Sequence, residues 1–227
     1  MQQNCYSNKS IIPRTIARFL RAFFRLLYHS FAWSYDAVAW MVSLGRWNDW
    51  VNSVIPFIQG SRVLEVGHGP GHLQVDLARK GLPAFGLDES RQMGRQAFLR
   101  LNKIMQPKLT RGRAENLPFP AESFEAVVST FPTEYIVQPA TLNEISRVLE
   151  PGGELVILLA AWFSGRGWLE RAAAFLFKLT GQVPSAKNQY QYLLQPFLVA
   201  GYIPRLEWIN QHSSRLLLII AEKPIRR

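Results

Sequence analysis

The sequence predicts an α/β fold, in which helices cover both faces of one doubly wound, mostly parallel sheet of seven strands. Short apolar runs alternate with helix-like stretches after about residue 60, and this alternation is typical of parallel sheets. The 227 residues, 48% of them hydrophobic, are enough for one sizeable core. Near the C-terminus, two apolar runs flank the polar residues 211–214, which indicates an antiparallel hairpin.

Each element is placed by its own local pattern. Strands are expected where short apolar runs are bounded by glycine, proline or charged residues, and helices where apolar residues recur at helical spacing. The expected strands are residues 62–66, 84–87, 109–111, 126–130, 154–160, 205–210 and 215–221. The expected helices are residues 73–80, 90–105, 139–149, 163–179 and 189–200. Since 154–160 is the most apolar strand, we expect it to be the central one.

Basic residues concentrate at the two ends of the chain. The formal net charge is +10, but residues 1–30 hold five bases and no acid, and residues 161–227 hold nine bases and three acids. The stretch between them therefore carries a net charge of −1, as an ordinary domain would. We expect an amphipathic, aromatic helical segment at residues 1–55, followed by one domain at 56–227 with a helical insertion at 162–200.

The N-terminal segment has three interpretations. Between residues 11 and 30, four arginines share one helical face and apolar residues occupy the rest: Arg14, Arg18, Arg21 and Arg25. Such a helix can lie on an anionic membrane surface, or its apolar side can pack on the domain as a lid. Its excess of bases also resembles an organelle presequence. No apolar run reaches spanning length and Cys5 has no disulfide partner, so we expect a cytoplasmic protein, with peripheral membrane contact as an open alternative.

The most informative stretch is a strand that ends in an acid and is followed by alternating glycines and a helix. Glu65 lies in the strand, and Gly67, Gly69 and Gly71 follow at G-x-G-x-G spacing. Glycines at this spacing let backbone amides approach a ligand closely, and the helix start offers unpaired N–H groups that suit a carboxylate or phosphate. A dinucleotide fingerprint would need glycine or alanine in place of His72. A merely structural turn is the alternative.

A second acid stands where the next strand ends. Asp88 lies 21 residues after Gly67, a place from which a carboxylate can accept hydrogen bonds from both ribose hydroxyls of an adenosine-containing ligand. The alternative is that Asp88 caps the helix that follows.

Three further segments complete a series in order along the chain: 112–120 (GRAENLPFP), 123–128 (SFEAVV) and 144–153 (EISRVLEPGG). With the glycine loop and Asp88, they resemble the motifs of the class I S-adenosylmethionine-dependent methyltransferases over residues 62–160. The resemblance is closest to the type 11 branch, which methylates small molecules and includes the carbon-methylating enzymes of quinone biosynthesis.

This resemblance implies a Rossmann-like sheet and S-adenosyl-L-methionine as the cofactor. In relatives, the acid of the first strand serves the methionine ammonium, the acid after the second strand holds the ribose, and the segment 112–120 lies beside adenine. A Tyr-Asp pair like Tyr35-Asp36 lies near the methionine end. The expected cofactor-binding residues are Tyr35, Glu65, Gly67, His68, Gly69, Gly71, Asp88, Glu89, Met93, Arg113, Ala114, Glu115 and Thr130. No Cys/His cluster has metal-ligand spacing, so no metal is expected.

Two residues depart from the family pattern. Where many relatives carry an acid that accepts the adenine amino group, this chain has Arg113, which can only donate. Adenine recognition would then fall to the backbone of Ala114 or to Glu115, with Arg113 stacking on a ring face. Glu125 replaces a more usual aspartate, which we interpret as a structural substitution.

The acceptor is expected beside the loop that follows the fourth strand. Phe131 and Tyr135 could wall an aromatic or lipid-like acceptor, and Glu134 or Tyr135 could take part in proton transfer. The alternative is a rigid loop with ordinary packing aromatics. His68 is a further catalytic candidate, as is His72.

Two apolar segments, residues 31–50 and 162–183, are expected to cover the acceptor and to contribute Trp47 and Trp168 to its site. We therefore expect a small hydrophobic acceptor, such as a quinone precursor or a lipid. An RNA methyltransferase is the enzymatic alternative, less favoured because no RNA-binding module is recognisable. The second alternative function is that of a non-catalytic, cofactor-binding protein at a membrane surface. No feature of the sequence indicates an oligomeric state.

Overall fold

The computed structural model of the chain describes residues 39–40, 43–164 and 192–225. Its strands are β1 Val63–Val66, β2 Phe85–Asp88, β3 Leu109–Arg111, β4 Phe124–Thr130, β5 Leu149–Phe163, β6 Ile203–Gln211 and β7 Ser214–Glu222. Its helices are α3 Trp47–Asn52, α4 His72–Arg79, α5 Arg91–Leu101, α6 Pro139–Val148 and α8 Gln195–Val199, with short 3-10 turns η2 Ile55–Phe57 and η3 Glu134–Val137.

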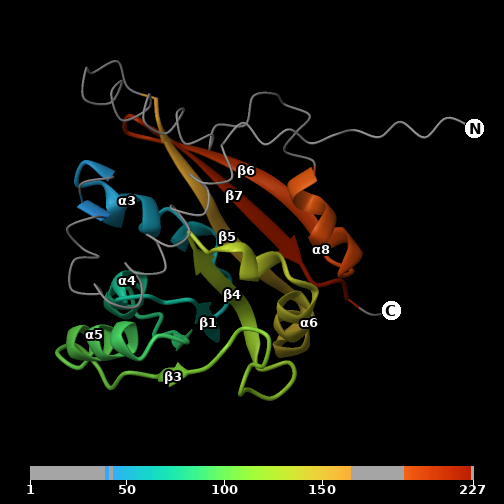
Figure 1. The fold of residues 1–227 in the computed structure, drawn as a ribbon, viewed down its shortest axis with the longest axis horizontal. Helices are drawn as coiled ribbons and strands as arrows, with labels where there is room; N and C mark the ends of the chain where they lie inside the picture. The colour runs from blue at the N-terminus through green and yellow to red at the C-terminus, as the bar shows by residue number, and fades with distance from the viewer. Residues whose placement is uncertain (1–38, 41–42, 165–191, 226–227) are drawn as a thin grey trace, which may run out of the picture.

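The strands form one sheet in the order β3-β2-β1-β4-β5-β7-β6 (Figure 1). β1 pairs in parallel with β2 and β4, while β7 runs antiparallel to both β5 and β6. The predicted seven-stranded, mostly parallel sheet with a C-terminal antiparallel hairpin is confirmed. Because the strand order reverses between β1 and β4, the carboxyl ends of these strands lie where sheets of this kind bind ligands.

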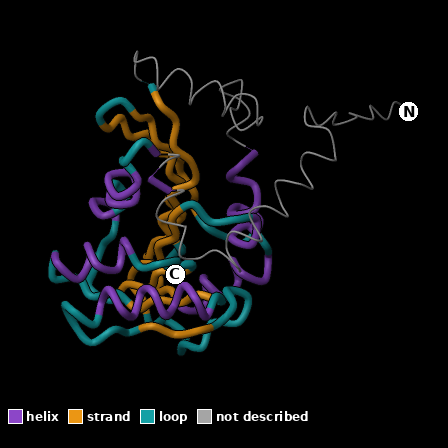
Figure 2. The backbone as a smooth tube through the Cα atoms, turned by 60° about the vertical axis from the view of Figure 1, so that its left-hand side comes forward, coloured by secondary structure: helices purple, strands orange, loops and turns teal. Residues whose placement is uncertain are grey.

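Helices cover both faces of the sheet (Figure 2). On one face, Leu73 and Leu77 of α4 pack in the same core as Val128 of β4. On the other face, Leu142 and Ile145 of α6 form part of the second core. These five side chains are at most 1% exposed. Full burial of one such side chain contributes about 1.5–3 kcal/mol, so the cores hold the strands, and the loops at their carboxyl ends, in fixed places.

The expected N-terminal helical segment is described only in part. α3 adds Trp50 and Val51 to the first core, whereas residues 11–30, the basic amphipathic stretch, lie outside the described residues. Among the helices that are described, none has both the length and the apolar character to cross a bilayer.

The long strand β5 corrects two sequence predictions. The sequence predicts a helix from residue 163, but β5 runs on through Phe163 because β7 offers backbone partners as far as Ser214. The rest of the predicted helix 163–179 falls almost entirely outside the described residues. The middle strand is β4 rather than β5; β5 is strongly apolar because two strands flank it and both cores contain its side chains.

Two helices are shorter than the sequence predicts. α5 ends at Leu101 rather than at residue 105, because Ile104 N–H bonds back to the Leu101 carbonyl in a tighter turn. In the described part of 189–200, the α-helix covers only Gln195–Val199. Both differences concern helix ends, which local patterns define poorly.

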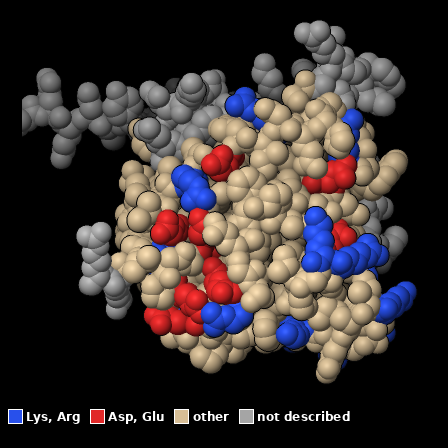
Figure 3. Space-filling view, turned by 180° about the vertical axis from the view of Figure 1, so that it is seen from behind, with Lys and Arg blue, Asp and Glu red and all other residues tan. Residues whose placement is uncertain are grey.

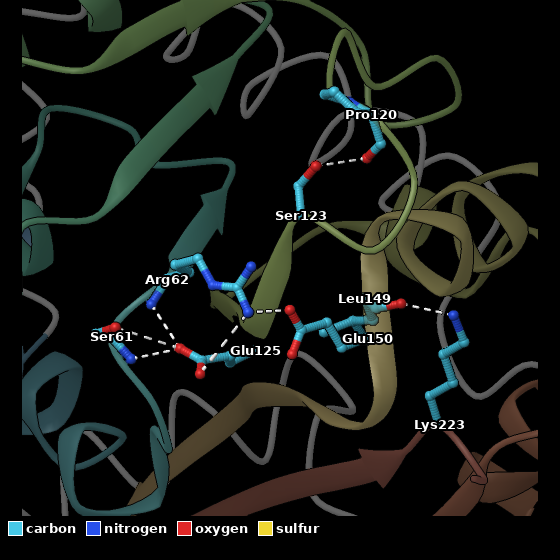
Figure 4. A network of polar contacts seen from close by, with 8 residues as sticks. All are labelled: Ser61, Arg62, Pro120, Ser123, Glu125, Leu149, Glu150 and Lys223. Atoms are coloured by element: carbon cyan, nitrogen blue, oxygen red, sulfur yellow. Dashed lines mark hydrogen bonds and ion pairs between the residues drawn. The ribbon is translucent and has the colours of Figure 1, made fainter.

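At the amino-terminal edge of the parallel strands, Glu125 connects β4 to the start of β1 (Figure 4). Its carboxylate accepts hydrogen bonds from the backbone N–H groups of Ser61 and Arg62 at 2.7 and 2.9 Å. The bond from Arg62, followed by that from Ser61, lowers the pKa of Glu125. Glu125 thus acts at the edge opposite to the expected ligand site, in agreement with its interpretation as a structural substitution.

Charges of both signs are mixed on the described surface. Figure 3 shows lysine and arginine side chains beside aspartate and glutamate side chains on one face of the molecule. Ion pairs such as Arg113–Glu115 and Arg205–Glu154 also bring opposite charges together on the described surface. The face in Figure 3 thus lacks, within the described residues, the extended basic stripe that is typical of nucleic-acid-binding surfaces.

Candidate active site

The glycine-rich loop follows β1 at the ligand-binding edge. Its glycines have left-handed backbones, with φ of 76° at Gly67, 53° at Gly69 and 85° at Gly71. A Cβ at Gly67 would collide with the Tyr135 hydroxyl, and one at Gly71 would lie 2.8 Å from the Cβ of Ala97 on α5. A Cβ at Gly69 would meet no described atom within 4 Å. Gly67 and Gly71 are therefore required for packing, whereas Gly69 leaves its backbone open to a ligand.

The carboxylate of Asp88, at the end of β2, holds this loop. Its Oδ2 accepts a hydrogen bond from Gly69 N–H at 2.9 Å, and its Oδ1 accepts one from Ser90 N–H at 2.8 Å. The side-chain cap of α5 is Ser90, whose hydroxyl accepts from Met93 N–H, so the alternative role of Asp88 as the helix cap is wrong. A carboxylate offers about four acceptor positions, and positions for two ligand hydroxyls remain.

Glu65 is an acid buried inside the sheet beneath the loop. The residue is 1% exposed, and its Oε2 has no hydrogen-bond partner among the described residues. Burial raises the pKa of Glu65 to about 8, a hydrogen bond with Gln74 opposes the shift, and the negative Asp88 adds to it. A buried carboxyl with an unused acceptor would be stabilised in its ionised form by a cation such as an ammonium group.

Replacing Glu65 by glutamine is expected to flatten the pH dependence of stability. The folded protein binds the Glu65 proton more tightly than the unfolded chain, because the pKa is about 8 instead of 4.5. This contribution to the free energy of unfolding is complete below pH 4.5 and is lost as the pH rises towards 8, by up to about 1.4 kcal/mol per pH unit.

Urea unfolding of the wild type and Glu65→Gln, without ligand and between about pH 5 and 9, measures this effect. The variant should become more stable relative to the wild type as the pH rises. If the two stability curves stay parallel, the carboxyl is not held in its protonated form by burial.

His68 is a buried part of the loop. The residue is 4% exposed, and its Nδ1 lies 2.7 Å from the carbonyl oxygen of Gly69, to which it donates. Burial lowers the pKa of His68, although the nearby Asp88 opposes this. His72 lies in the first turn of α4, with its Nε2 3.5 Å from Arg100. The Nδ1 of His68 is therefore used in a hydrogen bond within the loop, and its Nε2 is the ring nitrogen that remains for proton transfer.

The segment after β3 forms another wall of the site. Gly112 N–H donates to the carbonyl oxygen of Asp88 at 3.1 Å, which joins the segment to the end of β2. Arg113 is exposed and pairs with Glu115 at 3.1 Å and with Glu89 at 3.9 Å. Ala114 is buried, at 6% exposure. To stack on the adenine ring, the guanidinium of Arg113 would have to leave these two acids.

Two expected residues flank these walls. Met93 is 1% exposed in the first turn of α5, and Thr130 is the half-buried last residue of β4. Tyr35, expected at the cofactor, and Trp168, expected at the acceptor, lie outside the described residues. Apart from Met93 in α5, the other expected cofactor residues lie at the carboxyl ends of β1, β2 and β4 or in the segment after β3.

An aromatic cluster follows β4. Phe131 has a left-handed backbone, with φ of 48°, and its N–H donates to the Leu158 carbonyl at 2.8 Å. Its ring lies 4.8 Å from that of Trp47 and 6.3 Å from that of Trp50, centroid to centroid. Phe163 continues the cluster at 5.3 Å from Trp50. A bulky residue held in this conformation is strained and needs strong support, which the tilted rings of Trp47 and Trp50 supply.

Tyr135 and Glu134 lie in η3 and differ in their surroundings. The Tyr135 hydroxyl lies 3.4 Å from both the Val66 carbonyl oxygen and Ser129 Oγ, directly over Gly67. Glu134 is exposed at the start of η3. The structure therefore brings Tyr135, rather than Glu134, into contact with the glycine loop.

Sequence reasoning missed two polar residues of the site, Gln74 and Ser129. Both are buried, at 2% and 0% exposure. Gln74 hydrogen-bonds to Glu65 from α4, and Ser129 donates to the Val66 carbonyl at 2.7 Å. Their signal was a polar residue on the apolar face of a helix and another inside an apolar strand. Within the described residues, no group of His, Cys, Asp and Glu is arranged to hold a metal ion.

Comparisons with known proteins agree with this geometry. Residues 64–157 match the family described as Methyltransferase domain. The chain is 32% identical over 147 residues to a demethylmenaquinone methyltransferase of Symbiobacterium thermophilum, an alignment that covers 60% of this chain and 59% of that protein. It is 29% identical over 223 residues to a demethylmenaquinone methyltransferase of Mycobacterium sp., covering 88% of this chain and 94% of that protein.

Solved structures share the fold. Phosphoethanolamine N-methyltransferase 2 of Haemonchus contortus, in complex with S-adenosyl-L-methionine, is similar with a TM-score of 0.56 and 18% identity, covering 89% of this chain and 60% of that chain. The sheet order, the glycine loop after β1 and the acid after β2 are those of the class I fold. Together with the matched family model and the named relatives, they identify a methyltransferase that depends on S-adenosylmethionine. Residues 64–157 are the part of the chain that is similar to the Methyltransferase domain family.

Proposed function

We propose that this protein transfers the methyl group of S-adenosylmethionine to a small hydrophobic acceptor of the quinone-precursor type. The observation that carries the proposal is the half-buried pair of Trp47 and Phe131 beside the end of β4, which packs on the buried rings of Trp50 and Phe163. Aromatic rings that are partly exposed favour flat apolar molecules over hydrated ones. The names of the relatives in Symbiobacterium and Mycobacterium support the same acceptor class.

The residues of the loop fit the cofactor in three respects. The backbone at Gly69 is open, Asp88 retains acceptor positions for ribose hydroxyls, and the unused Oε2 of Glu65 suits the methionine ammonium. Ala114 and Glu115 would then lie at the adenine end. When bound, the cofactor supplies a methyl group already activated on a cationic sulfonium, so orientation of the acceptor can account for much of the rate.

Trp47 and Phe131 would orient the acceptor and exclude water from it. Tyr135 is the better placed proton-transfer candidate, because its hydroxyl already contacts the loop. Glu134 and His68 Nε2 would serve only if the acceptor approaches them directly. Peripheral membrane contact through residues 11–30 remains an expectation from the sequence.

The function is tested by transfer of labelled methyl from the cofactor to two acceptors, a naphthoquinol with an apolar side chain and total RNA. We expect label in the quinol only. Label in RNA that depends steeply on salt would support the RNA methyltransferase alternative instead. Binding of the cofactor without transfer to a lipid extract or to RNA would favour the non-catalytic alternative.

Replacing Trp47 by alanine is expected to raise KM for the quinol about 10-fold, because a ring contact between Trp47 and the quinol would contribute about 0.5–1.5 kcal/mol beyond its buried area. Steady-state kinetics measures the change, and affinity for the cofactor should stay the same. Phe98→Ala, which removes an aromatic ring that is 47% exposed on α5, is the control. Equal effects of the two variants on KM would place the acceptor elsewhere.

A further inference from the structure

A charged pair on α6 holds the segment that follows β3. Glu144 accepts a hydrogen bond from Leu117 N–H at 2.8 Å. Arg147 donates to the carbonyl oxygens of Leu117 and Phe119 at 2.9 and 2.8 Å. The two side chains also bind each other, at 2.7 and 2.8 Å. The pair therefore hydrogen-bonds both the N–H and the carbonyl group of Leu117. Because these hydrogen bonds involve charged side chains, they hold the segment after β3 firmly.

The helix that carries this pair is itself firmly anchored. Leu142 and Ile145 are at most 1% exposed in the second core, and the Tyr202 hydroxyl donates to the Leu142 carbonyl at 3.0 Å. The hydrogen bond from Arg147, followed by that from Leu117, keeps the pKa of Glu144 below its ordinary value. Glu144 thus carries its charge at neutral pH, and the pair acts as a fixed reference point on a rigid helix.

The held segment leads directly to the cofactor site. It leaves β3 at Gly112, whose N–H bonds to the Asp88 carbonyl, and a turn joins Asn116 N–H to the Arg113 carbonyl at 3.1 Å. Residues 113–115 therefore lie between two fixed ends, Asp88 on one side and the Glu144–Arg147 pair on the other. The backbone of these residues is the part of the chain that would meet the adenine end of the cofactor.

We propose that Glu144 and Arg147 are positioning residues that set the affinity for the adenosine end of the cofactor through the backbone of residues 113–117. This inference rests on the proposed function. Adenine lies far from the transferred methyl group, so a loosened segment should weaken cofactor binding and leave the chemical step nearly unchanged. If the pair merely stabilised the fold, its loss would lower the melting temperature without weakening cofactor binding selectively.

The test compares Arg147→Lys and Glu144→Gln with Arg205→Gln in the full chain. Lysine keeps the charge of Arg147 but not its fork, and glutamine keeps the shape of Glu144 but not its charge. Arg205 is the matched control, because it makes a 2.9 Å ion pair with the largely buried Glu154 at the other end of the sheet. Melting temperature, Kd for S-adenosylhomocysteine, KM for S-adenosylmethionine and kcat are measured for each.

We expect Kd and KM to rise about 10-fold in both α6 variants, the equivalent of about 1.4 kcal/mol, with kcat at saturating cofactor within about threefold. The control should melt earlier and bind S-adenosylhomocysteine like the wild type. If the wild type binds the ligand and both α6 variants bind it equally well, the inference is overturned while the proposed function stands. If the wild type does not bind it, the proposed function itself is contradicted.

Discussion

Replacing Gly69 by valine is expected to abolish cofactor binding, with an affinity at least about 100-fold lower than that of the wild type. Gly69 has a φ of 53°, and a side chain there would project into the open space before the loop. The backbone of this residue is the part of the loop that a ligand can approach, because Gly67 and Gly71 are closed off by Tyr135 and Ala97. A branched side chain would fill the open space beside Gly69 in which the ligand would lie.

Valine at this φ also strains the backbone, by about 1–2 kcal/mol, and this effect must be separated from the loss of binding. Gly81→Val provides the control. Gly81 has a φ of 77°, and a Cβ there would likewise meet no described atom within 4 Å, but it lies in the turn between α4 and β2. Both variants should lose similar stability in urea unfolding, and only Gly69→Val should lose affinity in calorimetry. Similar affinities in the two would remove the loop from the cofactor site.

Replacing Asp88 by asparagine is expected to weaken binding of S-adenosylhomocysteine about 10- to 100-fold. Hydrogen bonds to a charged acceptor contribute about 1.5–3 kcal/mol each. In addition, the carboxylate now accepts hydrogen bonds from the N–H groups of Gly69 and Ser90, and the NH₂ group of asparagine would face one of these donors and lose that bond. The variant should therefore lose both the ribose contact and part of the order of the loop.

The control for this change is Ser90→Ala, which removes the side-chain cap of α5 but keeps the Ser90 N–H that bonds to Asp88. Loss of the cap should cost about 1 kcal/mol of stability and leave affinity for S-adenosylhomocysteine within about twofold. Isothermal titration of the three proteins separates the effects. An Asp88→Asn protein that binds as tightly as Ser90→Ala would exclude Asp88 from ribose recognition.

The sequence predicted the sheet well because its signals are local. Each of the seven predicted strands is present in the described structure, and the positions of Glu65 near the end of β1 and Asp88 at the end of β2 followed from the predicted boundaries. The terminal hairpin followed from the four polar residues between two apolar runs, although both strands proved longer than predicted.

The remaining features depend on partners that are distant in sequence. β5 extends to Phe163 because β7 pairs with it, and no local pattern of residues 161–163 encodes that partner. Likewise, the contacts of Arg147 with Leu117 and Phe119 join positions about 30 residues apart, and Gln74 reaches Glu65 only once α4 has packed on the sheet. The expected residues Tyr35 and Trp168 lie outside the described part of the chain.

The most direct measurement is a calorimetric titration of the purified wild-type protein with S-adenosylmethionine. From the open space beside Gly69, the two remaining acceptor positions of Asp88 and the buried Glu65, we expect one binding site per chain, with a Kd of about 1 μM to 1 mM, as is usual for enzyme ligands. Absence of heat and of thermal stabilisation at millimolar cofactor would contradict the account.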